Sequence, residues 1–122
     1  MPPTIIRASD VPLQDFGGVK LYSLASPSQG SADHVVLRGQ VAVGAEFPAH
    51  SHDRDEILVF IAGRAAYTIG GEAGVVSEGD VVVVPAGAVH SFEALEDIDA
   101  IAILPAGALT SDPSGALIEQ RV

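Results

Sequence analysis

Cysteine is absent from the 122 residues of this chain, and basic residues are scarce, with six Lys and Arg against 16 Asp and Glu. Without cysteine there is no disulfide framework, no thiolate metal site and no cysteine nucleophile. The formal net charge of −10 disfavours nucleic acids and anionic lipid surfaces, because both bind clustered cations. We therefore expect neither a nucleic acid nor a membrane as a partner.

Long apolar runs are absent as well. No stretch approaches the roughly 18 uninterrupted apolar residues that a membrane-spanning helix needs. The start of the chain lacks the basic and then apolar pattern of a signal peptide. Hydrophobic residues nevertheless make up 48% of the chain, which argues against intrinsic disorder. These features predict a folded cytoplasmic protein.

The length favours one domain. We expect residues 1–122 to form it, with a core at 34–104 between an irregular N-terminal segment, 1–33, and an irregular C-terminal tail, 105–122. Thirteen glycines and eight prolines divide the chain into segments rich in Val and Ile, mostly of strand length. The strands predicted from these segments are 34–43, 56–61, 65–69, 81–85, 89–95 and 100–104.

Turn signals separate these strands, and Gly70-Gly71 is typical of a hairpin. Closely spaced strands with glycine turns predict an all-β sandwich or barrel. The four consecutive valines at 81–84 indicate a strand that is buried on both faces.

Two histidines, His50 and His52, lie two residues apart and would point to the same face of a β-strand. Glu56 follows a short polar loop, so its carboxylate can reach the same point. Two imidazoles and a carboxylate are the usual donors to a first-row transition metal where no thiolate is present. The pair alone is also compatible with ordinary core or surface histidines, so the flanking pattern matters.

Glycine and proline punctuate the chain at fixed intervals around these residues. The first set is Gly44, His50, His52, Glu56 and Gly63, and the second set is Gly79, Pro85, Gly87 and His90. The two sets resemble the two motifs of the cupin family, and the first matches at every defining position. The 15 residues between them, 64–78, resemble the short spacing of small single-domain microbial cupins.

The resemblance implies an all-β double-stranded β-helix, the cupin or jelly-roll barrel. It implies that His50, His52, Glu56 and His90 bind one divalent transition metal: Fe(II), Mn(II), Ni(II), Co(II), Cu(II) or Zn(II). Ligand type does not choose among these metals, because affinity follows the Irving–Williams order. Four protein ligands on an octahedral ion leave two positions open, as a catalytic site requires. Small cupins also commonly form homodimers through their N-terminal strands, so a homodimer is expected.

One position departs from the family's pattern. The family often has asparagine four residues after the histidine of the second motif, where this chain has Ala94. Because that asparagine is not a metal ligand in the family, the departure bears on a contact near the site rather than on the ligands.

Strand alternation extends the site to a predicted pocket. Leu58 and Phe60 should share the face of Glu56, and Phe92 should share the face of His90. The predicted pocket residues are Arg38, Gln40, Leu58, Phe60, Phe92, Ile101 and Ile103.

Candidates for catalysis are Arg38, Gln40 and Tyr67. Arg38, if it points inward, could anchor a carboxylate or enolate oxygen. Gln40, Tyr67 and also Glu46 are candidates for proton transfer. In the ligand loop, Asp53 and Asp55 predict a solvated acidic turn; the other interpretation is that they attract cations to the site.

Three classes of function are compatible with this pattern, each with a small-molecule substrate or ligand. The first is a dioxygenase whose apolar pocket excludes water from reactive species. The second is a non-redox isomerase, cyclase, lyase or decarboxylase in which the ion acts as a Lewis acid. The third is a non-catalytic ligand-binding or sensing module.

Overall fold

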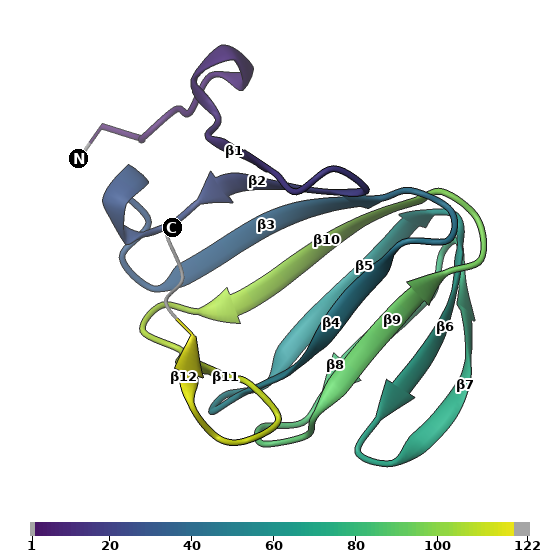
Figure 1. Ribbon diagram of the computed structural model, residues 1–122. Coiled ribbons are helices and arrows are strands. Elements are labelled where there is room, and N and C mark those ends of the chain that lie inside the picture. Colours follow the sequence, from purple (N-terminus) through teal and green to yellow (C-terminus); the bar gives the residue numbers. More distant parts are fainter. Residues whose placement is uncertain (1, 119–122) are drawn as a thin grey trace.

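Short β-strands make up most of the structure, a computed structural model that describes residues 2–118 (Figure 1). The strands are β1 (Leu13–Asp15), β2 (Val19–Ala25), β3 (His34–Val41), β4 (Glu46–His52), β5 (Glu56–Ala62), β6 (Arg64–Ile69), β7 (Glu72–Ser77), β8 (Val81–Val84), β9 (His90–Ala94), β10 (Ile98–Pro105), β11 (Thr110–Ser111) and β12 (Leu117–Ile118). Two 3₁₀ turns, η1 (Ala8–Asp10) and η2 (Pro27–Gln29), lie near the N-terminus. Within the described residues, no helix is long and apolar enough to cross a membrane.

The strands form two six-stranded antiparallel sheets that face each other (Figure 1). Sheet A has the order β1-β2-β3-β10-β5-β8, and sheet B has the order β12-β11-β4-β9-β6-β7. From β3 to β10 the chain crosses repeatedly between the sheets, so neighbours within a sheet are mostly distant in sequence. This is a jelly-roll arrangement, and the prediction of an all-β cupin barrel is confirmed.

The predicted strands correspond to β3, β5, β6, β8, β9 and β10. Gly70 and Gly71, with φ of 57° and 85°, form the hairpin turn between β6 and β7. The valine run was misread as a doubly buried strand, because β8 lies at the edge of sheet A. Val81 and Val83 point outward there and are each 59% exposed.

The expectation of irregular ends is also wrong. Residues 1–33 contain β1 and β2, and β2 pairs with β3 in sheet A. The tail, as far as the structure describes it, contributes β11 and β12 to sheet B. β1, β11 and β12 have only two or three residues and carry no periodicity of their own, whereas β2 has seven residues and was missed although it is long enough to show one.

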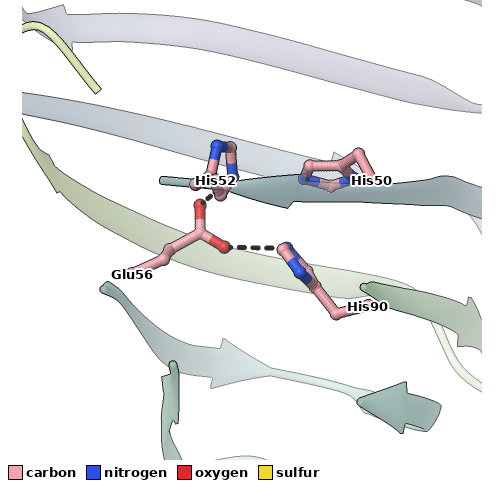
Figure 2. A group of neighbouring side chains, drawn as sticks. All are labelled: His50, His52, Glu56 and His90. Atoms are coloured by element: carbon pink, nitrogen blue, oxygen red, sulfur yellow. Dashed lines mark ion pairs between the residues drawn. The ribbon is translucent and has the colours of Figure 1, made fainter. Parts of the chain in front are cut away.

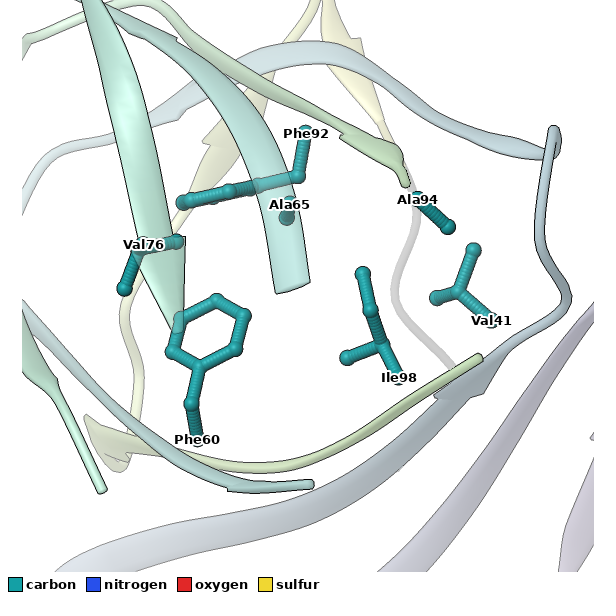
Figure 3. Packing of buried hydrophobic residues seen from close by; sticks show 7 residues of the cluster. All are labelled: Val41, Phe60, Ala65, Val76, Phe92, Ala94 and Ile98. Carbon is teal, nitrogen blue, oxygen red and sulfur yellow. The ribbon is translucent and has the colours of Figure 1, made fainter. Parts of the chain in front are cut away.

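The main core lies between the sheets (Figure 3). Its buried members are Val41, Phe60, Ala65, Val76, Phe92, Ala94 and Ile98. The rings of Phe60 and Phe92 join the two sheets, with centroids 5.8 Å apart. Ala94, which replaces the family's asparagine, is 2% exposed and lies opposite Ala65 on β6. Two small side chains thus face each other at this point of the core.

Candidate metal centre

His50, His52, Glu56 and His90 converge between the two sheets (Figure 2). Each offers one ligand atom, and these four atoms all lie within 4.8 Å of one another. The histidines belong to sheet B and Glu56 to sheet A, so the site bridges the sheets. His50 is half-buried and the other three side chains are buried. The four residues named from the sequence are therefore close enough to share one ion.

A β-bulge aims His50 at this point. Phe47 lies opposite Phe92 and His50 lies opposite His90, so β4 contains one residue more than β9 over this stretch. The extra residue reverses the alternation of β4, and both Phe47 and His50 face inward. Pro48, which donates no backbone hydrogen bond, lies within the bulge, where proline is tolerated in a strand.

The loop between His52 and Glu56 is fixed by its two aspartates. The carboxylate of Asp53 accepts a hydrogen bond from the backbone N–H of Leu109, and that of Asp55 accepts one from Ala86, at 2.7 and 2.9 Å. Both side chains are exposed, as the predicted acidic turn requires. They also attach the loop to two neighbouring segments, which sequence alone did not indicate.

The outer ring nitrogens of all three histidines are engaged. Nδ1 of His50 lies 2.8 Å from the carbonyl of Pro48, and Nδ1 of His90 lies 2.9 Å from that of Ala88. A carbonyl only accepts, so in each neutral ring Nδ1 carries the proton and Nε2 keeps a free lone pair. For His52, Nδ1 lies 2.8 Å from the hydroxyl of Thr110.

The inner nitrogens face the carboxylate. Nε2 of His52 and of His90 lie 3.3 and 3.2 Å from the two oxygens of Glu56. Yet both nitrogens are buried without a hydrogen bond of good geometry. A buried polar atom without a partner is costly. Lone pairs aimed at a common point beside a carboxylate suit a bound cation, so this donor set fits a divalent transition metal.

Burial and the carboxylate determine the protonation of the site. Burial raises the pKa of Glu56, but the imidazoles of His52 and His90 lower it by more, to about 2. Burial lowers the pKa of His50. Burial also lowers the pKa of His90, but Glu56 outweighs it, and the net shift is upward. A carboxylate and a neutral His50 are the forms that bind metal.

Part of the predicted pocket is wrong. Buried Val35 and Val41 face the core from β3, so the even-numbered Arg38 and Gln40 lie on the outer face of sheet A. Arg38 instead forms an ion pair there with Asp99, with 2.6 Å between Nη2 and Oδ2. Neither Arg38 nor Gln40 points toward the four converging residues.

The same alternation corrects two isoleucines. Ile98 and Leu104 are buried and face inward from β10, so Ile101 and Ile103 point outward beside Arg38 and Val36. These isoleucines do not line the interior. Residues 100–104 are apolar on both faces of the strand, so their sequence does not show which face is inward.

The other pocket residues lie on the inner faces. Phe60 and Phe92 are buried in the core, and Leu58 packs against it. Tyr67 is half-buried on β6, opposite Phe92. Its ring lies over Gly74, where an added Cβ would be 2.5 Å from the phenol oxygen. A contact of these residues with a substrate stays a prediction.

A hollow of about 660 Å³ opens between β7 and β8, and its lining includes Tyr67, Ile69 and Val82. Ile69 lies opposite the ligand His90 in sheet B, and Val82 lies opposite Leu58 in sheet A. The hollow thus begins one strand away from the converging residues.

Two neighbours of the site were not predicted from sequence. The ring of Phe47 lies 5.4 Å from that of His50, and Phe47 fell outside every predicted strand. Thr110 contacts His52 from the tail that was expected to be irregular. No local pattern identifies a strand of two residues.

A two-sheet jelly roll with three histidines and a glutamate between its sheets is the architecture of the cupins. A family model described as a cupin domain matches residues 37–104, more than half of the chain. The protein belongs to this family.

One curated relative matches part of the chain and carries no described activity. The uncharacterised protein SCO3923 of Streptomyces coelicolor is 44% identical over 46 residues, which make up 38% of this chain and 44% of SCO3923. The match thus spans less than half of that relative's length.

Two solved structures share the fold. The polyketide cyclase RemF from Streptomyces resistomycificus has a TM-score of 0.76 and 15% identity, over 98% of this chain and 88% of RemF. The salicylate 1,2-dioxygenase of Pseudoaminobacter salicylatoxidans, solved as adducts with gentisate, has a TM-score of 0.71 and 17% identity, over 89% of this chain and 31% of the dioxygenase. At these identities the likeness concerns the fold alone.

Proposed function

We propose that this protein is a metal-dependent enzyme of the dioxygenase type, acting on a small organic molecule that carries oxygen donors. The observation behind this proposal is the convergence of three imidazole nitrogens and a carboxylate, two of the nitrogens being buried and without hydrogen bonds. His50, His52, Glu56 and His90 would hold the ion. A bound redox-active ion would supply Lewis acidity and the activation of oxygen.

The protein's own residues would bind the substrate and exclude water. Leu58, Phe60 and Phe92 form an apolar interior beside the cluster, which protects reactive species from hydrolysis. In the overall reaction both oxygen atoms of O₂ enter the product. The substrate supplies all four electrons, so no further reductant is needed.

The placement of the proton-transfer candidates favours oxygen chemistry over proton transfer. Gln40 lies on the outer face of sheet A, and Glu46 is exposed opposite Glu93. Of the three candidates, only Tyr67 lies on an inner face. Arg38, the candidate anchor for an anionic oxygen, also lies on the outer face. A dioxygenase depends less on proton-transfer groups than an isomerase does.

A non-redox cyclase, isomerase or lyase is the second candidate. It is favoured by the match to the polyketide cyclase RemF, which extends over 88% of that protein, and by the inward position of Tyr67. In this case the phenol would serve as the proton-transfer group while the ion acts as a Lewis acid.

Oxygen uptake distinguishes the candidates. Protein purified without chelators or an affinity-column metal is analysed for its metal content, then loaded in turn with Fe(II), Mn(II), Ni(II), Co(II), Cu(II) or Zn(II). Gentisate, the ligand of the dioxygenase neighbour, is the first probe in a panel of hydroxylated acids. We expect uptake that is lost in His90→Ala and kept in His34→Ala, because His34 is an exposed histidine outside the cluster.

Other results assign the protein differently. Anaerobic conversion with Zn(II) would support the cyclase or isomerase class. Saturable ligand binding without turnover would support a sensing module. Failure of the wild-type protein to bind any of the six metals would refute the metal site itself.

A homodimer is part of the proposal, through a different surface from the N-terminal strands expected at first. The outer face of sheet A carries eight apolar side chains: Val36, Ile57, Val59, Ile61, Val81, Val83, Ile101 and Ile103. Such patches are typical of interfaces. The neighbouring charges, Arg38 and Asp99, are paired with each other. Two copies of a chain with a net charge of −10 can therefore meet here without opposing acidic groups.

Light scattering tests this surface. Val83→Asp should convert the dimer into a monomer, whereas Val75→Asp, at a valine of β7 with a similar exposure of 55%, should not. A wild-type monomer would refute the proposal. The cytoplasmic location stays a prediction.

A further inference from the structure

The histidines of the cluster differ in what binds their outer nitrogens. His50 and His90 contact backbone carbonyls, which only accept hydrogen bonds. His52 instead contacts the side-chain hydroxyl of Thr110, at 2.8 Å. A hydroxyl both donates and accepts. The proton of the neutral His52 ring can therefore lie on either nitrogen without loss of this hydrogen bond.

The contact is buried and held by the backbone. Thr110 and His52 are each 4% exposed, and they lie opposite each other where β11 pairs with β4. A second attachment lies next to it: the Asp53 N–H donates to the carbonyl of Leu109, and the Leu109 N–H donates to the Asp53 carboxylate. These bonds hold the hydroxyl against the ring.

Glu56 lies at the other ring nitrogen of His52, Nε2. Its carboxylate lies 3.3 Å from Nε2 of His52, and this negative charge favours a proton on that nitrogen. A protonated Nε2 has no lone pair for a metal. When Nε2 binds an ion, the proton of the ring lies on Nδ1, where the hydroxyl of Thr110 is within hydrogen-bond distance.

We infer that Thr110 is a positioning residue for the metal centre: its hydroxyl, held 2.8 Å from Nδ1, fixes the ring of His52 so that Nε2 faces the ion. This role rests on the metal site proposed above, and it makes the C-terminal hairpin β11–β12 part of that site. The hydroxyl acts through His52 and contacts neither the ion nor a substrate.

Substitutions at Thr110 and its neighbour separate this role from folding. Thr110→Val keeps the shape and removes the hydroxyl, Thr110→Ala does so with less bulk, and Thr110→Ser retains the hydroxyl. Ser111→Ala is the control, because Ser111 lies in the same strand but points to the opposite face. Thermal unfolding checks that each variant is folded.

Two measurements are made on each variant. A crystal structure of each metal-free variant reports the orientation of the His52 ring. Titration with Zn(II) or Mn(II) reports the metal affinity. We expect Thr110→Val and Thr110→Ala to release the His52 ring from its wild-type orientation and to lose about 10- to 100-fold in affinity, as for other residues that orient a ligand. Thr110→Ser and Ser111→Ala should match the wild type.

The results separate this inference from the proposed function. Wild-type metal binding with unchanged affinity and ring orientation in Thr110→Val would overturn the role of Thr110 and leave the metal site standing. Absence of metal binding in the wild type would refute the proposed function, while the ring orientation in the metal-free variants would still test the hydrogen bond. A loss of affinity in Thr110→Ser equal to that in Thr110→Val would also overturn the inference, because the hydroxyl would then not matter.

Discussion

Gly63, the last glycine of the first motif, should tolerate alanine poorly for a reason unrelated to metal. It lies between β5 and β6 with φ of +91°, in the left-handed region. A Cβ built on it would overlap the carbonyl oxygen of Asp97 and lie 2.8 Å from its carbon and 3.0 Å from Cα of Ile98. These are backbone atoms, so no side-chain rotation relieves the overlap.

Two terms set the size of the effect. The left-handed conformation costs a non-glycine residue about 1–2 kcal/mol. Forcing extra bulk into a packed site costs about 1–3 kcal/mol. Together they predict a loss of about 2–5 kcal/mol in the free energy of unfolding. At about 4 °C per kcal/mol for a domain of this size, the melting temperature should fall by about 8–20 °C.

Gly71→Ala is the matched control. Gly71 has nearly the same φ, +85°, but nothing lies within 4 Å of its added Cβ. Alanine there should cost only the backbone term, about 1–2 kcal/mol. Both variants are unfolded by heat and by urea with a chelator present, so that a bound metal adds nothing to the difference.

The difference between the two variants measures the approach of Asp97 to Gly63. If Gly63→Ala is no less stable than Gly71→Ala, this close approach does not exist in solution. If neither substitution lowers the melting temperature, the cost assigned to the left-handed backbone is wrong for this chain.

Three further outcomes follow from the packing, the ion pair and the metal site. Phe60→Ala should destabilise the protein by about 3–5 kcal/mol, because Phe60 is 2% exposed; Ile61→Ala, at a 51% exposed neighbour, should cost far less in urea unfolding. The hydrogen bond from Arg38 lowers the pKa of Asp99, so this pair stabilises the fold above the ordinary carboxyl pKa and the contribution is lost as the pH falls. Asp99→Asn should therefore cost at most about 1 kcal/mol near neutral pH, because the pair is partly exposed, and the difference from wild type should shrink in acid; a constant difference would contradict this. Removing the metal with a chelator should lower the melting temperature, since an ion at 100 times its dissociation constant adds about 2.7 kcal/mol; an unchanged scan would contradict a bound ion.

Local patterns predicted six of the described strands, and the resemblance to the cupin motifs predicted the four converging residues. Glycines at fixed intervals mark turns such as Gly70-Gly71, and alternation along β4 places His50 and His52 on one face. The distance in sequence between Glu56 and His90 did not obscure the site, because each lies in its own motif. These features depend on single strands and their ends, which short segments specify well.

Alternation failed where a strand is apolar on both faces. Ile101 and Ile103 were predicted to line the pocket, yet they lie on the outer face of sheet A, as do Arg38 and Gln40 of β3. The valines of β8 were misread for the same reason. A one-residue change of register exchanges the two faces of a strand, and an apolar sequence does not mark which face is inward.

The sequence by itself predicted the all-β class and the glycine turns, because alternation and turn formation are local properties, and its resemblance to the cupin motifs predicted the four converging side chains. Only the tertiary structure decided which side chains surround that cluster. Three features depend on how strands distant in sequence pair: the bulge before His50, the outward Arg38 and the contact of Thr110 with His52. The energy of pairing comes from side chains of both strands, so neither strand's sequence alone predicts it.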